Sequence, residues 1–148
     1  MEIGILALGC FWGPEIKFGK LYGVTKTEVG YCGGNTVNTN YKEVCSGKTN
    51  HAEVVKIEFD NSKITFEEIL NYFFEIHDPT TLNQQGPDIG TQYRSEIFCL
   101  NKNQMKIALR VFEKYNKKYN GNVVTKISEI KNYTKAEDYH QKYLEKKI

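Results

Sequence analysis

Residues 2–9 are mostly aliphatic and end in a glycine. A cysteine and two large aromatic residues follow directly. A run of this length and composition predicts a short strand that is fully buried. Pro14 follows it closely, and proline is tolerated in the first turn of a helix because its missing N–H is not needed there. We therefore predict a short helix from Gly13 or Pro14 to Lys20. Cys10 then lies at the corner between a strand and a helix.

The rest of the chain alternates between periodic segments and two long polar stretches. Thr65 and Glu68 have the spacing of a capping box, and an apolar stripe follows them. Asn101 marks the start of a second strong helical pattern, and Gly121 suits its end. We expect strands at 24–31, 51–60, 93–100 and 123–130, helices at 65–77 and 101–120, irregular loops at 35–50 and 79–92, and a short helix or turn at 136–148.

This order of elements indicates an α+β fold, in which helices pack on a mixed sheet in two layers. The chain has 148 residues, which is the length of one typical domain. A chain of this length can bury a sufficient core without disulfides. We therefore expect residues 1–148 to form a single domain, and we expect this domain to be a monomer.

Charge and cysteine usage exclude several classes of protein. The formal net charge is +2 and the lysines are mixed with acidic residues, so nucleic acid is not an expected partner. The N-terminal apolar run is too short to span a membrane and no basic segment precedes it, so we expect a cytoplasmic protein without membrane contact. The four cysteines form no C-x-x-C pair, and we expect no metal site.

Cys10 is the first candidate for chemistry. Backbone N–H groups and the dipole at a helix N-terminus favour an anion, so this position predicts a lowered pKa for the thiol. A thiolate is a strong nucleophile. The alternative is that Cys10 is a small buried hydrophobic residue, which is the usual role of an unpaired cysteine.

Glu53 is the second candidate, because it interrupts an apolar face. In an alternating strand it shares that face with Val55, Ile57 and Phe59. Burial among these side chains would raise the pKa of the carboxyl and keep it protonated. A neutral acid at pH 7 can give a proton to an oxygen atom. The alternative, that Glu53 reaches solvent at the start of the strand, is equally consistent with the pattern.

Tyr41, Tyr93 and Asp88 lie in or beside the two irregular loops, where long segments are often functional. Their hydroxyl and carboxyl groups could hydrogen-bond a substrate. Phe11 and Trp12 could form an apolar wall beside the thiol. Each of these aromatic residues could equally belong to the core, since the chain contains many of them.

Considered together, five blocks of sequence resemble the peptide methionine sulfoxide reductase A family, in the family's order and over nearly the whole chain. The resemblance implies a ferredoxin-like core and thiol-dependent reduction of methionine-S-sulfoxide, free or in proteins, to methionine. The blocks are GCFWG (9–13), GYCGG (30–34), YKEVCSGKTNHAEVV (41–55), HDPTTLNQQGPDIGTQYRS (77–95) and AEDYHQKYL (136–144).

The same resemblance assigns roles to the residues singled out above. It implies that Cys10 attacks the sulfoxide sulfur and becomes a sulfenic acid, while Glu53 protonates the oxygen. Tyr41 and Tyr93 would hold that oxygen by hydrogen bonds.

Around this centre, the resemblance implies that Phe11 and Trp12 cradle the substrate's methyl group. Asp88 would orient the polar side of the site. This chemistry needs no metal or organic cofactor.

Regeneration of Cys10 is where this sequence departs from many members of the family. Many of them carry recycling cysteines in a glycine-rich C-terminal tail, whereas the last cysteine here is Cys99. We expect an external thiol to resolve the sulfenic acid, from glutaredoxin with glutathione or from thioredoxin. Cys32 is a possible internal resolving residue, although a structural role fits it better. We expect structural roles for Cys45 and Cys99 as well.

Two other classes of function remain open at this point. A thiol hydrolase or transferase would pair Cys10 with a histidine base, for which the chain offers His51, His77 and His140. A non-catalytic module would bind methionine side chains through its aromatic residues, but it would gain little from a desolvated acid.

Overall fold

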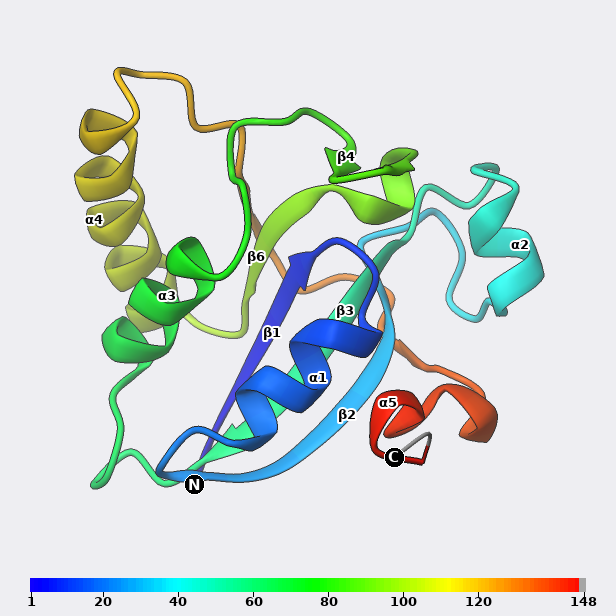
Figure 1. Cartoon of the computed structure of the whole chain (residues 1–148), viewed down its shortest axis with the longest axis horizontal. Helices are drawn as coiled ribbons and strands as arrows, with labels where there is room; N and C mark the ends of the chain where they lie inside the picture. The colour runs from blue at the N-terminus through cyan, green and yellow to red at the C-terminus, as the bar shows by residue number, and fades with distance from the viewer. Residues whose placement is uncertain (147–148) are drawn as a thin grey trace.

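A six-stranded mixed sheet forms the centre of the structure, in the order β7-β6-β1-β3-β2-β8. Figure 1 labels its four inner strands, β6, β1, β3 and β2. The computed structural model describes residues 1–146, so the last two residues of the expected domain 1–148 lie outside the described residues. The strands are β1 (Glu2–Leu8), β2 (Val24–Cys32), β3 (Ala52–Phe59), β6 (Ser95–Cys99), β7 (Lys126–Glu129) and β8 (Thr134–Lys135).

The four inner strands have the expected ferredoxin-like arrangement. β1 pairs antiparallel with both β3 and β6, and β2 pairs antiparallel with β3. A helix follows β1 and another follows β3, which makes the βαββαβ unit. β7 is added parallel to β6 at one edge, so the sheet is mixed.

Three helices, α1 (Trp12–Gly19), α3 (Phe66–Glu75) and α4 (Lys102–Lys118), pack against the sheet in one layer (Figure 1). The capping box expected at the start of α3 is present, because Thr65 and Glu68 hold each other's backbone N–H groups. At the start of α4, Asn101 accepts a hydrogen bond from the backbone N–H of Gln104. The largest buried side chains of this layer are Phe11, Phe18, Phe73, Phe74, Leu70 and Ile69.

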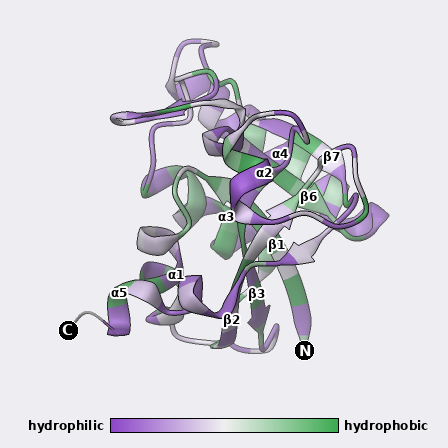
Figure 2. Cartoon of the chain, turned by 90° about the vertical axis from the view of Figure 1, so that its right-hand side faces the viewer, coloured by the Kyte–Doolittle hydropathy of each residue, from purple (hydrophilic) through white to green (hydrophobic). Residues whose placement is uncertain are grey.

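The opposite face of the sheet carries a smaller apolar cluster that includes Ile5, Ala7, Cys32 and Phe98. Tyr133 from the segment before β8 packs against it. Figure 2 shows the same distribution along the chain, because hydrophobic residues lie mainly in the sheet and the outer loops are mostly hydrophilic. The fold is therefore the two-layer α+β arrangement expected from the sequence. No helix in residues 1–146 has both the length and the apolar character needed to cross a membrane.

The segments expected to be irregular contain short elements instead. The first long loop forms α2 (Tyr41–Cys45), because Asn40 accepts a hydrogen bond from the backbone N–H of Glu43 and caps its first turn. An element this short has no periodicity to read, so the prediction of an irregular loop at 35–50 is wrong there. The other short elements are β4 (Gln84–Gln85), β5 (Asp88–Ile89), the 3₁₀ turns η1 (Thr91–Tyr93) and η2 (Asp138–His140), and α5 (Tyr143–Lys146).

The fit around Gly34 gives a first testable prediction. A Cβ atom at Gly34 would lie 1.9 Å from Nδ1 of the fully buried His51, so nothing larger than glycine fits. Gly34→Ala should lower the free energy of unfolding by about 1–3 kcal/mol or more, because the buried ring has to move. Urea unfolding followed by circular dichroism would measure this. In the control Gly13→Ala, the new Cβ meets nothing within 4 Å, and equal stability of the two variants would contradict the prediction.

Candidate active site

Cys10 lies in the tight turn between β1 and α1. Gly9 has a φ of +99°, and a Cβ atom there would lie 2.8 Å from the side chain of Gln85. Glycine is required for both reasons. Gln85 is part of the β4–β5 hairpin and holds the backbone of Asp78 through two hydrogen bonds, at 2.9 and 2.8 Å. The second long loop is thereby packed directly on the turn that carries the cysteine.

Glu53 lies on β3 beside this turn, and its side chain is 1% exposed. Its Oε1 accepts a hydrogen bond of 3.2 Å from the backbone N–H of Phe11, the residue after Cys10. Burial raises the pKa of the carboxyl to about 8, against the lowering effect of this hydrogen bond and with a smaller raising effect from Asp88. The carboxyl is therefore mostly protonated at pH 7 and does not reach solvent, which decides between the two alternatives that the alternating pattern left open.

The thiol of Cys10 does not behave as its position at a helix end suggested. Burial raises its pKa to about 11, and the backbone N–H of Trp12 lowers it by less. Negative charge on Glu53 and Asp88 raises the pKa further. The sequence-based prediction of a lowered pKa is wrong, because one backbone N–H does not compensate for desolvation of the thiolate. This raised pKa favours the neutral thiol at neutral pH.

The two tyrosines of the candidate site, Tyr41 and Tyr93, lie on different loops. Tyr41 is the first residue of α2, and its ring centroid lies 4.5 Å from that of His140. Burial and the thiol of Cys45 raise the pKa of Tyr41. Tyr93 is the last residue of η1, and burial followed by the charge of Glu53 raises its pKa to about 12. Both hydroxyls are therefore neutral and able to donate hydrogen bonds.

Asp88 begins β5 and is partly buried. Its charge acts on the pKa values of Glu53, Cys10 and Tyr93. Asp88 therefore belongs to the same neighbourhood as the thiol, the carboxyl and the second phenol.

The two aromatic residues after the cysteine have different environments. Phe11 is 1% exposed and packs on the rings of Tyr31 and His140, with centroids 5.7 and 5.2 Å away. Trp12 is only partly buried, and its indole stacks on Tyr143 at 3.8 Å. Its Nε1–H donates to Nδ1 of His140 at 3.1 Å. Phe11 is thus a core residue, whereas Trp12 is a fixed aromatic surface at the edge of the site.

The C-terminal segment organises the site in a way that the sequence did not indicate. The carboxylate of Glu137 accepts hydrogen bonds from the backbone N–H of Tyr41 at 2.9 Å and from the hydroxyl of Tyr31 at 2.8 Å. Gln141 hydrogen-bonds both backbone groups of Val29 on β2. Only the resemblance of the block AEDYHQKYL to the family could have marked this segment, because it has no periodicity.

The other three cysteines have different surroundings, and Cys45 is the one that acts on the pKa values of Cys10 and Tyr93. Cys32 is fully buried in the cluster on the opposite face from Glu53, and its thiol donates to the carbonyl of Lys131 at 3.3 Å. This location does not favour Cys32 as a resolving residue. Cys99 is buried in the helix-side core, and Cys45 is exposed at the end of α2.

The histidines offer no base to Cys10. His77 bonds the carbonyl of Phe73 at 2.6 Å and the hydroxyl of Ser95 at 2.8 Å, and His140 accepts from Trp12. His51 is fully buried, and burial lowers its pKa against the raising effect of backbone hydrogen bonds with Asn132 and Thr36. These contacts do not favour the hydrolase alternative.

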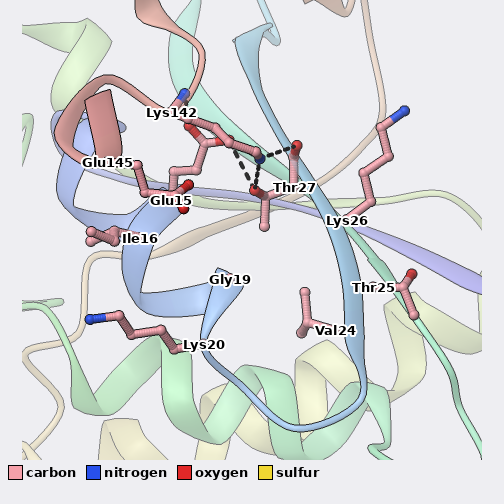
Figure 3. A pocket seen from close by; sticks show the side chains of 10 residues that line it. All are labelled: Glu15, Ile16, Gly19, Lys20, Val24, Thr25, Lys26, Thr27, Lys142 and Glu145. Carbon is pink, nitrogen blue, oxygen red and sulfur yellow. Dashed lines mark hydrogen bonds and ion pairs between the residues drawn. The ribbon is translucent and has the colours of Figure 1, made fainter. Parts of the chain in front are cut away.

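A cavity of about 360 Å³ lies beside the C-terminal half of α1, between this helix, β2 and α5 (Figure 3). Glu15 in its wall accepts hydrogen bonds from Thr27 at 2.9 Å and from the backbone N–H of Lys142 at 2.7 Å. None of the expected site residues lines this cavity, and its polar groups already bind one another. It is a structural junction rather than the site. Among residues 1–146, no three His, Cys, Asp or Glu side chains are grouped as metal ligands.

A thiol beside a buried carboxyl and two phenols, on a ferredoxin-like sheet, is an arrangement that suits an oxidoreductase. The model of the family described as peptide methionine sulfoxide reductase matches residues 2–148. The chain belongs to this family, and its activity is the reduction of methionine sulfoxide to methionine.

Individual relatives agree with this assignment. The chain is 67% identical to the peptide methionine sulfoxide reductase MsrA of Pelagibacter ubique, over 99% of this chain and 100% of that protein. Methionine sulfoxide reductase A of Corynebacterium diphtheriae has a similar structure, with a TM-score of 0.94, 39% identity and coverage of 98% and 74% of the two chains. Mxr1 of Saccharomyces cerevisiae in complex with Trx2 matches with a TM-score of 0.69 and 27% identity, over 96% of this chain and 84% of that one.

Proposed function

We propose that Cys10 and Glu53 carry out the reduction together, on the S epimer of methionine sulfoxide. The observation that carries the proposal is the buried Glu53 carboxyl, which is bonded to the backbone beside Cys10 and has a pKa of about 8. A merely structural carboxyl gains nothing from such burial, whereas an acid that must be protonated at neutral pH requires it.

The reaction then balances without a further reactant. Glu53 gives its proton to the sulfoxide oxygen, which makes the sulfur electrophilic. The sulfur of Cys10 bonds to it while the thiol proton returns to the Glu53 carboxylate. The hydroxyl group is transferred to Cys10, the bond between the two sulfurs breaks, and methionine leaves. Cys10 is oxidised to a sulfenic acid as the substrate sulfur is reduced.

The surrounding residues select and hold the substrate. The neutral hydroxyls of Tyr41 and Tyr93 donate hydrogen bonds to the sulfoxide oxygen, which is the negative end of the S–O bond in the bound substrate. Trp12 offers its fixed indole to the methyl group, and Phe11 supports this wall from the core. Asp88 orients the polar side of the site.

An external thiol closes the cycle in this proposal. The contacts of Cys32 do not favour an internal disulfide, and Cys99 is buried in the core. Thioredoxin is a candidate reductant because a structural relative forms a complex with Trx2, and glutaredoxin with glutathione is the other. Both free and protein-bound methionine sulfoxide are candidate substrates.

A stereospecific assay tests this function. Methionine formation from each separate sulfoxide epimer is measured with dithiothreitol, and then with thioredoxin or with glutaredoxin and glutathione. We expect turnover of the S epimer alone, with at least one of the two protein reductants replacing dithiothreitol. Turnover of the R epimer at an equal rate would contradict the epimer assignment. Failure of both protein reductants while dithiothreitol works would contradict the proposed partners.

A further inference from the structure

Arg94 directly follows Tyr93 in the sequence, and its side chain is held in a buried network of hydrogen bonds. Its side chain is 12% exposed. One terminal nitrogen donates to the carbonyl of Thr91, the first residue of η1, at 2.8 Å. Its Nε donates to Oε1 of Glu96 on β6 at 2.7 Å. The guanidinium therefore ties the turn that presents Tyr93 to the adjoining strand.

Glu96 anchors this network within the sheet. It is 2% exposed, and its second oxygen accepts a hydrogen bond of 2.6 Å from the hydroxyl of Ser128 on β7. Glu96 lies opposite Ala7 in the β1–β6 register, and Ala7 belongs to the cluster on the face away from the helices. The network therefore lies on the opposite side of the sheet from Glu53, and Arg94 does not take part in the chemistry itself.

The guanidinium has little freedom in this position. A Cβ atom on Gly33 would lie 3.1 Å from Nη2 of Arg94 and 2.6 Å from the ring of Phe98. The planar group is therefore packed closely on the backbone of Gly33. A guanidinium that donates hydrogen bonds to a carbonyl and a carboxylate at the same time is held in one orientation. The ammonium group of a lysine cannot make the same pair of directed hydrogen bonds.

Tyr93 needs such an anchor because its hydroxyl has no hydrogen-bond partner among the described residues. Its position depends on the backbone of η1, where its N–H bonds the carbonyl of Gly90 at 3.0 Å. A buried ion pair contributes little net stability, since desolvation offsets the attraction, but it can fix a geometry. Arg94 binds the same three-residue turn from the other side.

We propose that Arg94 is a positioning residue, which sets the Tyr93 hydroxyl for the sulfoxide oxygen through its hydrogen bond to the Thr91 carbonyl. The inference rests on the role of Tyr93 in the proposed function. The phenol stays free to bind substrate because the restraint acts on its backbone and not on its hydroxyl.

A double-mutant cycle tests the proposal. The single-turnover rate of methionine formation at saturating sulfoxide is measured for Arg94→Lys, Tyr93→Phe and the double variant. We expect Arg94→Lys to lower the rate by about tenfold in the wild type and to have no further effect in Tyr93→Phe. The control Arg110→Lys changes an exposed ion pair with Glu67 and should leave the rate unchanged.

Four results are decisive against the proposal or against its basis. A folded Arg94→Lys variant with the wild-type rate overturns it, and so does a loss of rate that is just as large in the Tyr93→Phe background. A wild-type rate in Tyr93→Phe alone removes Tyr93 from the proposed function, which the cycle reveals independently of Arg94. If Arg94→Lys does not fold, Ser128→Ala replaces it in the cycle, because this substitution frees one oxygen of Glu96. Ser128→Ala should then lower the rate by a smaller factor, and only while Tyr93 is present. If Ser128→Ala causes no such Tyr93-dependent loss of rate, the proposal is overturned.

Discussion

Glu53→Gln is expected to lower turnover by about 10²–10⁴-fold at pH 7, the contribution of a well-placed general acid. Glutamine keeps the size of the side chain and can still accept the hydrogen bond from the backbone N–H of Phe11, but it has no proton to give. In the wild type, turnover should fall about tenfold per pH unit above about pH 8, where the carboxyl ionises. Activity assays from pH 6 to 10 would measure both effects.

The same substitution should make the protein more stable at alkaline pH. The pKa of Glu53 is raised on folding from 4.5 to about 8, so the native state binds more protons than the unfolded state between these values. Its contribution to stability is therefore full below about pH 4.5 and is lost as the pH rises through about 8. At pH 9 the cost of the buried carboxylate is on the order of 4 kcal/mol, and Glu53→Gln removes it.

Thermal unfolding of the wild type and Glu53→Gln at pH 5, 7 and 9 would test whether the variant becomes the more stable protein as the pH rises. The matched control is Glu58→Gln, a partly exposed residue on the same strand whose carboxyl is outside the site. An unchanged difference in melting temperature between the wild type and Glu53→Gln over this range would show that Glu53 does not titrate as a buried acid. Full activity of Glu53→Gln would remove it from the chemistry.

Cys10→Ser should abolish turnover completely, because a serine hydroxyl cannot form the sulfenic intermediate and is a far weaker nucleophile. Binding of the sulfoxide should persist, since Trp12 and the two phenols are unchanged. In the wild type without reductant, mass spectrometry after one turnover should find one added oxygen atom on the peptide that contains Cys10. Glutathione should then convert it to a mixed disulfide.

Cys32→Ser is the matched control for this experiment, because serine can keep the hydrogen bond to the carbonyl of Lys131. It should leave the rate and the oxidised product unchanged. Detection of a Cys10–Cys32 disulfide after one turnover would overturn resolution by an external thiol. Measurable turnover by Cys10→Ser would show that another group carries the reaction.

The long periodic elements could be predicted because they follow from local rules, and the same rules made a buried acid at Glu53 one of two open alternatives. The capping box at Thr65, the stripe that follows it and the alternation around Glu53 each need only neighbouring residues to be recognised. The short elements could not be predicted, since five residues of α2 have no period and depend on the cap at Asn40.

The raised pKa of Cys10 could not be predicted from neighbouring residues. Its place before a helix was visible in the sequence, but the extent of its burial depends on how the loop around Gln85 packs on Gly9. The supports of the site are likewise non-local: Glu137 reaches Tyr41, and His140 reaches Trp12, across most of the chain.

The amino-acid sequence by itself determined the family, the sheet with its helices and the residue types that can do the chemistry, because motifs and periodicity are properties of adjacent positions. Only the tertiary structure decided which groups are desolvated, which of the two adjacent aromatic residues is fully buried and how the backbone of each phenol is held. Those properties depend on contacts between segments that are distant in the chain, and burial and hydrogen-bond geometry arise only once these segments have packed together.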